Sequence, residues 1–505
     1  MPVPRDNVDA LFQSAANLLM QQRYREAVPV YRQALARVPA HADGWFNLAF
    51  ALKRLGDFAA ALEAYSRALA CRPAHAEEIH LNRAVIYSDH LRDESAAERE
   101  LRAALELAPA HSAAWLNLGN LYEEQGKREP ARACYLQLLH VAPTAGSGAA
   151  LRLEAMARLA SLSTPEQLDD TLLRSLHAAA DNGDGDRGND PARASLYFAL
   201  GRHYDRIGDV DRAMDAFSRG KQTAHRSSPA YQPEVEAQLI DQLIAAPVAH
   251  REALCSDDAD APAPLFICGL FRSGSTLIEQ VLSGHPMIAA AGELDLLPRM
   301  VRDQLSPYPQ TLARVSVEDA RRLAQQYCEQ RPAALTASAN GPRYVTDKRP
   351  DNYRLIGLIK RLFPSAKIIH TQRHLLDNGL SIYMQHLNPR RFGYAATLSS
   401  IGHQMGHYQR LMDHWRQCYP DDIYDFSYDA FVRDPGPQLA ALLRFLQLPD
   451  HPACLAFNER SASVKTASLW QVRRPLYAEA SGRWQRYRAQ LQPLIDALPA
   501  DTPLT

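Results

Sequence analysis

The sequence lacks the features of a secreted or membrane-spanning protein. Its seven cysteines are scattered and never spaced as CxxC, so neither a zinc site nor a disulfide framework is indicated. It has no uncharged apolar run of about 18 residues, the length that a membrane-spanning helix needs. The N-terminal segment MPVPRDNVDALFQ has no apolar core of a signal peptide. We therefore expect a cytoplasmic protein in a reducing compartment, with no membrane span.

The sequence also lacks an excess of charge of either sign. Lysine and arginine total 56, aspartate and glutamate total 57, and the net charge is −1. Such a balance argues against bulk nucleic-acid binding, so we expect no nucleic-acid partner. A chain of 505 residues with 46% apolar residues predicts two or three domains with sizeable cores.

A period of about 34 residues runs through the N-terminal part of the chain. Pro39, Pro73, Pro109 and Pro143 follow one another at spacings of 34, 36 and 34 residues. An alanine stands twelve residues before each proline, and a large apolar or aromatic residue stands eight before it. This pattern predicts helix pairs that pack closely through small residues. Because the middle spacing is longer, we expect a small insertion near residues 88–93.

These positions resemble the tetratricopeptide repeat family, most closely over Ala42–Pro73 and Ser112–Pro143, with a further unit near Ala194. The resemblance implies an all-α solenoid over residues 1–250 whose concave face holds a protein or peptide substrate or another partner. The alternative is a structural spacer or dimerisation element, and a homodimer stays open. The Gly/Asp-rich run 181–190 does not have EF-hand spacing, so we interpret it as a surface loop.

The composition changes at residues 251–264, where DDADAPAP predicts a linker. The apolar run 265–270 then predicts a buried strand, Phe271–Thr276 a turn, and 277–282 a helix. A strand, a turn of small residues and a helix start together point backbone N–H groups and the positive end of the helix dipole at an anion.

This turn is close to a nucleotide-triphosphate P-loop but lacks its lysine, because Ser275 stands in that position. Arg272 carries a planar guanidinium suited to phosphate or sulfate ester oxygens. The turn therefore predicts a site for a phosphorylated nucleotide other than ATP with Mg²⁺. An ordinary turn without a ligand is the alternative.

Further polar residues follow later in the domain, several of them at the ends of predicted strands. Since ligand sites of open α/β sheets lie at the carboxyl ends of strands, we expect these side chains to surround one ligand. They are Glu293 after an Ala-Gly pair, Lys348 at the end of 344–348, Arg373 at the end of 367–373 with Ser381 eight residues on, and Tyr428 at the end of 422–428.

Together these segments resemble the sulfotransferase superfamily over about residues 264–487, in particular tyrosylprotein sulfotransferases and bacterial repeat-fused sulfotransferases. The resemblance implies an α/β, P-loop-like domain with a parallel sheet over residues 265–495. It implies 3′-phosphoadenosine 5′-phosphosulfate (PAPS) as co-substrate and no metal. Phe271 stands where the family's loop has proline, and Gln385 where tyrosylprotein sulfotransferases place a second arginine.

The same resemblance assigns roles to individual residues. Glu293 is the general base, while Lys348 and Arg272 neutralise charge on the reacting oxygens. The implied nucleotide contacts are Arg272, Ser273, Gly274, Ser275, Thr276, Arg373, Ser381, Tyr428, Ser468 and Arg483.

The acceptor implied by Glu293 is a tyrosine hydroxyl of a protein or peptide. Hydroxyls of saccharides, lipids or small molecules are alternatives. Two other classes of protein compete with a sulfotransferase: an atypical P-loop kinase, which the missing lysine disfavours, and a repeat scaffold with an inactive nucleotide-binding domain.

Overall fold

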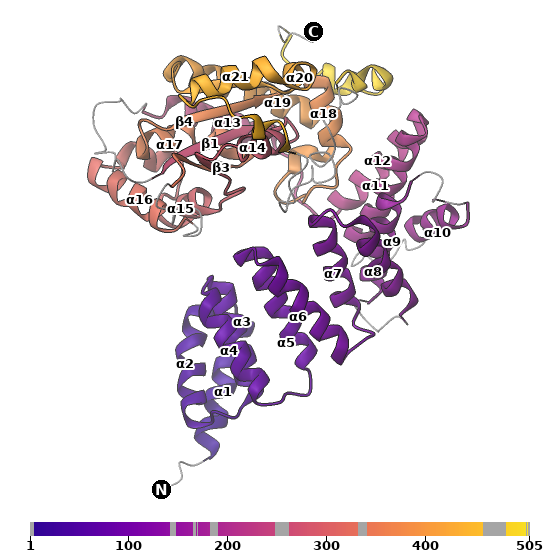
Figure 1. Cartoon of the computed structure of the whole chain (residues 1–505), viewed down its shortest axis with the longest axis vertical. Helices are drawn as coiled ribbons and strands as arrows, with labels where there is room; N and C mark the ends of the chain where they lie inside the picture. Colours follow the sequence, from indigo (N-terminus) through magenta and orange to yellow (C-terminus); the bar gives the residue numbers. More distant parts are fainter. Residues whose placement is uncertain are drawn as a thin grey trace. The chain divides into compact units, whose positions relative to one another are not determined.

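The structure is a computed structural model, which describes residues 5–141, 148–164, 168, 170–181, 190–247, 262–331, 341–457, 481–500 and 502 (Figure 1). The chain divides into two compact units, Met1–Ala179 and Ala180–Thr505. The expected boundaries at 1–250, 251–264 and 265–495 stay a prediction. Most of the expected linker and of the Gly/Asp-rich run lies outside the described residues, although Ala263 and Pro264 belong to the first strand.

The first unit consists of successive helix pairs, which confirms the predicted all-α repeats. The pairs are α1 (Arg5–Met20) with α2 (Tyr24–Arg37), α3 (Ala42–Leu55) with α4 (Phe58–Ala70), α5 (Ala76–Val85) with α6 (Glu94–Leu107), and α7 (Ser112–Glu124) with α8 (Arg128–His140), followed by α9 (Gly148–Leu162) and α10 (Asp170–Asp181).

The periodic residues form the core between the helices of each pair. The four periodic alanines are fully buried, and so are the tyrosines four residues after three of them. A Cβ at Gly119 would lie 2.4 Å from the ring of Tyr135, so only glycine lets α7 and α8 approach this closely. The predicted insertion is confirmed as a π-helical turn, η1 (Ile86–Leu91), which absorbs the extra residues at the end of α5.

The second unit contains a parallel sheet, as predicted; it has five strands in the order β2-β3-β1-β4-β5. Its strands are β1 (Ala263–Gly269), β2 (Ile288–Ala289), β3 (Tyr344–Lys348), β4 (Lys367–Gln372) and β5 (Ile423–Ser427). β1 is central, and the later strands β3 and β4 pair on its two sides. The strand order therefore reverses at the carboxyl end of β1, where open α/β sheets bind ligands.

Helices cover both faces of the sheet. Leu265 and Ile267 share a core with α14 (Ser275–Leu282), α20 (Tyr428–Arg433) and α21 (Pro435–Phe445). Phe266 points to the other face, where its ring contacts Tyr327 of α16 (Val317–Glu329) and Phe363 after α17 (Ile356–Leu362). Because both faces are buried, β1 is apolar along its length instead of alternating.

Three helices that precede β1 pack on this domain inside the second unit: α11 (Asp190–Arg206), α12 (Val210–His225) and α13 (Pro233–Ala245). Asp205 accepts hydrogen bonds from Arg483 at 2.5 Å and from the Tyr487 hydroxyl at 2.7 Å. Lys221 donates to the carbonyl of Gln385 at 3.0 Å, just beyond α18. These polar contacts fasten α11 and α12 to the sheet domain.

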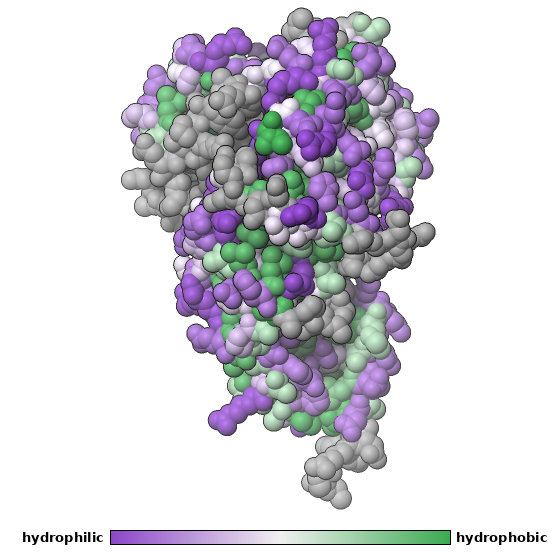
Figure 2. All heavy atoms as spheres, turned by 90° about the vertical axis from the view of Figure 1, so that its right-hand side faces the viewer, coloured by the Kyte–Doolittle hydropathy of each residue, from purple (hydrophilic) through white to green (hydrophobic). Residues whose placement is uncertain are grey.

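The remaining elements of the second unit are α15 (Leu296–Gln304), η4 (Gln310–Arg314), η6 (Pro350–Leu355), α18 (Leu375–Tyr383), η7 (Gly393–Ala396), α19 (Leu398–Cys418), η8 (Pro452–Cys454), η11 (Arg483–Tyr487) and α23 (Gln492–Ile495). On the face shown in Figure 2, green hydrophobic residues gather mainly in the middle and lower parts, mixed with purple hydrophilic ones. Among the described residues, none of the helices combines the length and the apolar character that crossing a membrane requires.

Candidate active site

The predicted phosphate loop joins β1 to α14 as expected. Gly274 has φ +104°, and a Cβ there would lie 2.8 Å from the ring of Tyr428, so both the backbone and the close approach require glycine. Arg272 is also left-handed, at φ +71°, and its Nε donates to Ser381 Oγ at 3.1 Å. The first turn of α14 begins at Ser275 and faces this loop, which places a helix N-terminus beside a buried guanidinium.

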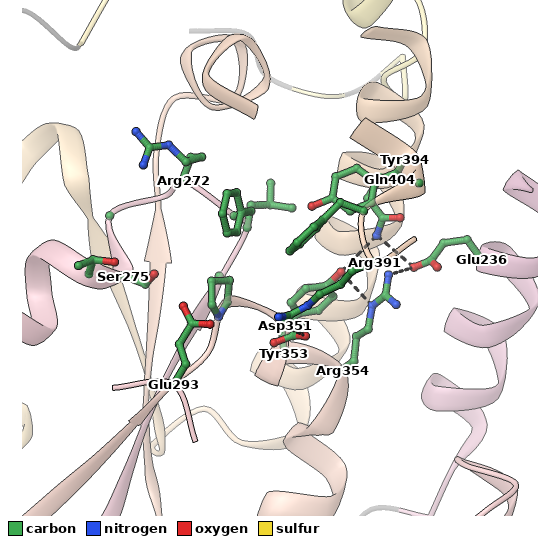
Figure 3. Close-up of a pocket in the computed structure, with 18 of the residues that line it drawn as sticks. Glu236, Arg272, Ser275, Glu293, Asp351, Tyr353, Arg354, Arg391, Tyr394 and Gln404 are labelled. Carbon is green, nitrogen blue, oxygen red and sulfur yellow. Dashed lines mark hydrogen bonds and ion pairs between the residues drawn. The ribbon is translucent and has the colours of Figure 1, made fainter. Parts of the chain in front are cut away.

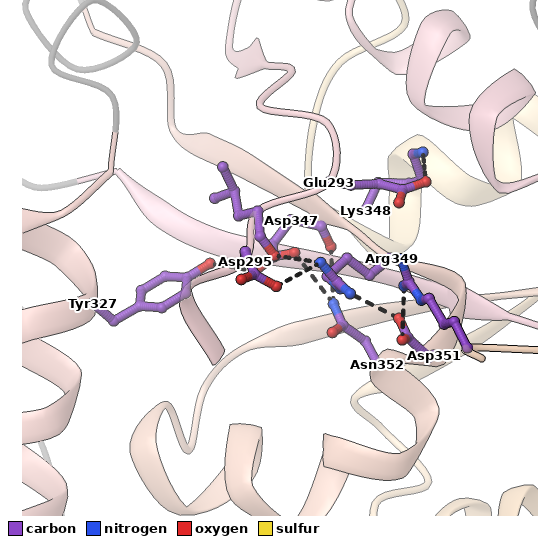
Figure 4. Close-up of polar contacts among 10 residues, drawn as sticks. Glu293, Asp295, Tyr327, Asp347, Lys348, Arg349, Asp351 and Asn352 are labelled. Atoms are coloured by element: carbon purple, nitrogen blue, oxygen red, sulfur yellow. Dashed lines mark hydrogen bonds and ion pairs between the residues drawn. The ribbon is translucent and has the colours of Figure 1, made fainter. Parts of the chain in front are cut away.

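Glu293 and Lys348 form an ion pair with 2.9 Å between Oε1 and Nζ (Figure 4). The Lys348 side chain is 1% exposed and that of Glu293 is 32% exposed. Glu293 therefore neutralises a buried ammonium while remaining accessible to a ligand. Glu293 lines a cavity of about 360 Å³ together with Arg272, Ser275 and Thr276 (Figure 3). The predicted base and the predicted phosphate loop thus face the same space.

Hydrogen bonds from two elements hold the turn that carries Glu293. Glu279 of α14 is 3% exposed and accepts from the Gly292 amide at 2.9 Å and from the Thr346 hydroxyl at 2.7 Å. Thr346 in turn accepts from the Ala291 amide at 3.0 Å. The helix behind the phosphate loop therefore also fixes the turn before Glu293. Glu279 could not be predicted as a functional residue, because nothing in its local spacing distinguishes it from an ordinary helix glutamate.

A polar network supports β3 on the side opposite Lys348 (Figure 4). Asp347 is fully buried and accepts from the Tyr327 hydroxyl at 2.8 Å and from Asn352 at 3.3 Å. Burial raises the pKa of Asp347 to about 7, although these hydrogen bonds and the charge of Arg349 act to lower that pKa. The network holds the end of β3, where Lys348 lies.

The residues expected around the nucleotide do not all face the cavity. Tyr428 stacks under the Arg373 guanidinium, 4.9 Å from the ring centroid, and also contacts Gly274. Ser273 is 1% exposed, and its hydroxyl donates to the Leu270 carbonyl at 2.6 Å and lies 2.6 Å from Thr371 Oγ1. Its side chain therefore fastens the loop to β4.

The expected nucleotide contact Arg483, and Gln385, which stands where the family has a second arginine, contact other parts of the second unit. Arg483 pairs with Asp205 of α11; burial would lower the pKa of Arg483, but Asp205 more than offsets this effect, so the pKa is raised. Gln385 follows α18, and its carbonyl accepts from Lys221. Ser468 lies outside the described residues.

Comparison with known proteins identifies both parts of the chain. The model of the sulfotransferase family matches residues 264–452, and tetratricopeptide repeat models match residues 14–76 and 112–144. An uncharacterised protein of Aquifex aeolicus is 29% identical over 79% of this chain and 52% of its own length. This chain thus spans about half the length of that relative.

Two animal enzymes are also similar to this chain. Protein-tyrosine sulfotransferase 1 of Danio rerio is 23% identical over 47% of this chain and 72% of its own length. Protein-tyrosine sulfotransferase of Drosophila melanogaster is 23% identical over 47% of this chain and 51% of its own length.

Among solved structures, the sulfotransferase domain of the Synechococcus PCC 7002 olefin synthase is 23% identical, with a TM-score of 0.32 over 50% of this chain and 94% of that domain. Residues 264–452 of the chain form a domain of the sulfotransferase family, in a protein whose N-terminal part carries tetratricopeptide repeats.

Proposed function

We propose that the protein transfers a sulfuryl group from PAPS to a tyrosine hydroxyl of a protein or peptide, with Glu293 as general base. The observation that carries the proposal is the partly exposed Glu293, paired with buried Lys348, in the cavity that the phosphate loop lines. A base for the acceptor proton and cations for the leaving phosphate are the two groups that sulfuryl transfer needs most.

In the proposed reaction the acceptor oxygen forms a bond to sulfur as its proton passes to Glu293. The bond between sulfur and the 5′-phosphate oxygen breaks, and its electron pair stays on the phosphate. Lys348 and Arg272 stabilise the negative charge that develops on these oxygens, since preformed cations in a partly buried site cost no reorganisation.

The nucleotide is proposed to lie along the carboxyl ends of β1, β4 and β5. The loop residues Arg272–Thr276 would hold its 5′ end, through the N-terminus of α14 and the Arg272 guanidinium. Arg373 and Tyr428 would contact the remainder, because each directly follows a strand end, and Ser381 of α18 would join them, because it accepts from Arg272 of the loop. Ser468 and Arg483 stay in the proposal as further nucleotide contacts.

Two features favour a polypeptide acceptor: the names of the animal relatives and the presence of the repeats. The repeat unit would hold this polypeptide. A saccharide or small-molecule hydroxyl is the alternative acceptor, and a scaffold with an inactive nucleotide-binding domain is the alternative of another class.

The test combines ligand binding with transfer. The 3′,5′-bisphosphate product is expected to raise the melting temperature, whereas ADP with Mg²⁺ is not. With labelled PAPS and a tyrosine peptide, Glu293→Gln is expected to lower kcat about 10²- to 10⁴-fold. Glu318→Gln, at an exposed site on α16, serves as the matched control. Stabilisation by ADP with Mg²⁺ alone refutes the sulfotransferase proposal, and a wild-type rate in Glu293→Gln refutes the assignment of the base.

A further inference from the structure

The cavity that contains Glu293 extends to a helix outside the family domain. Tyr231 and Glu236 line this cavity together with Tyr353, Arg354 and Gln404 (Figure 3). Glu236 belongs to α13 and Tyr231 stands just before it, whereas the family match begins at residue 264. One wall of the candidate acceptor site therefore comes from the segment between the repeats and the sheet domain.

The side chains of this wall hold one another in place. Glu236 Oε1 accepts from Arg354 Nη2 at 2.5 Å and from Gln404 Nε2 at 3.0 Å. The Tyr231 hydroxyl donates to Gln404 Oε1 at 3.3 Å, and Arg354 Nε donates to the Tyr353 hydroxyl at 3.1 Å. Glu236 and Gln404 are buried. Loss of the carboxylate would leave Arg354 without its counter-charge and free to turn into the cavity.

Three further aromatic side chains, those of Phe271, Phe392 and Tyr394, line another part of the cavity. Phe271 and Phe392 contact each other with ring centroids 5.1 Å apart, and Tyr394 stands edge-on to Phe392. Besides the proposed catalytic groups, the charged lining residues form two ion pairs, Arg354 with Glu236 and Arg391 with Asp351. Aromatic walls with neutralised charges suit a flat, uncharged ring, and a volume of about 360 Å³ is at the small end for ligand sites.

We infer that Tyr231 and Glu236 determine acceptor specificity, and that the pocket they close takes a single aromatic ring that carries the reacting hydroxyl. The inference rests on the proposed function and adds to it both the shape of the acceptor and the helix that selects it. The ring can belong to a tyrosine side chain or to a free phenol.

Kinetics with two acceptors test the inference on the full-length protein. KM and kcat are measured for a tyrosine peptide and for 4-nitrophenol in wild type, Glu236→Gln and Tyr231→Phe, together with the Kd of the 3′,5′-bisphosphate. Asp241→Asn is the matched control, because Asp241 also lies on α13 and also pairs with an arginine, here Arg410 of α19, while Asp241 does not line the cavity.

We expect Glu236→Gln to raise KM for both acceptors about tenfold or more, since it removes a charged hydrogen bond, while the bisphosphate Kd stays within about twofold. A rise in KM for the peptide alone also supports the proposed ring-binding pocket, and it assigns the ring to a tyrosine side chain. Unchanged KM values in both variants, or equal effects of Asp241→Asn, overturn the inference.

The bisphosphate Kd also shows whether each variant is folded. Should Glu236→Gln fail to fold, Tyr231→Phe decides the question, because it removes a single hydroxyl. Absence of transfer by the wild type to either phenol refutes the proposed function itself. If the wild type transfers the sulfuryl group but the variants keep the wild-type KM values for the acceptors, only the role of α13 is refuted.

Discussion

Replacing Glu279 tests whether α14 positions the proposed base. Glu279→Leu keeps a side chain of similar length but removes the acceptor of two donors, the part-buried Gly292 amide and the buried Thr346 hydroxyl. A buried donor left without a partner costs about 1–3 kcal/mol and a part-buried one costs less, so this variant is expected to lose about 2–4 kcal/mol of unfolding free energy. Glu279→Gln keeps an acceptor oxygen in the same place, and we expect a loss of about 1 kcal/mol.

The assay pairs urea unfolding with transfer kinetics. If Glu279 acts by holding the turn before Glu293, the leucine variant loses kcat more than it changes KM for the acceptor, and the glutamine variant recovers most of kcat. Glu318→Leu, at an exposed position, is the control for introducing leucine. An unfolding free energy of Glu279→Leu within about 0.5 kcal/mol of the wild-type value would refute the hydrogen-bond reasoning. Lost stability with full kcat would refute the positioning role.

Two further predictions concern pH. Because burial raises the pKa of Asp347 from 3.8 to about 7, the native state keeps a proton that the unfolded chain releases. The stability from this group is full below about pH 4 and declines toward pH 7, so the unfolding free energy of wild type relative to Asp347→Asn should fall over that window. Burial lowers the pKa of Lys221 from 10.5 to about 7. The unfolded chain then binds more protons, so wild-type stability relative to Lys221→Met should rise from about pH 7 to pH 10.5. Urea unfolding at several pH values measures both, and a difference that does not vary with pH contradicts either prediction.

Some of the site could be predicted because it is local in sequence. A phosphate loop needs only one strand, one turn and one helix start, so Phe271–Thr276 indicated it in six consecutive residues. Lys348 was predictable because it ends a predicted strand of a parallel sheet, whereas Glu293 was singled out by the resemblance of its Ala-Gly-Glu segment to the family. The repeats were predictable since each unit uses the same small and aromatic positions.

The remainder depends on tertiary packing that no local pattern records. Tyr231 and Glu236 reach the cavity only because α13 packs on α19, and their spacing resembles that of any surface helix. Ser273 fits a ligand-binding motif, yet its hydroxyl is engaged within the protein, at Leu270 and Thr371. A motif specifies which residue types stand in a loop, while neighbouring strands decide which way each hydroxyl points.

At Arg272, folding stability and the proposed chemistry favour different residues, because its backbone is left-handed. A residue with a Cβ at φ +71° costs about 1–2 kcal/mol relative to glycine, so glycine here would favour folding. The same exchange would delete the guanidinium that bonds Ser381, in a residue that lines the same cavity as Glu293. In a random search for thermostable variants, this position would therefore yield stability at the expense of activity, the trade-off expected of a residue retained for chemistry.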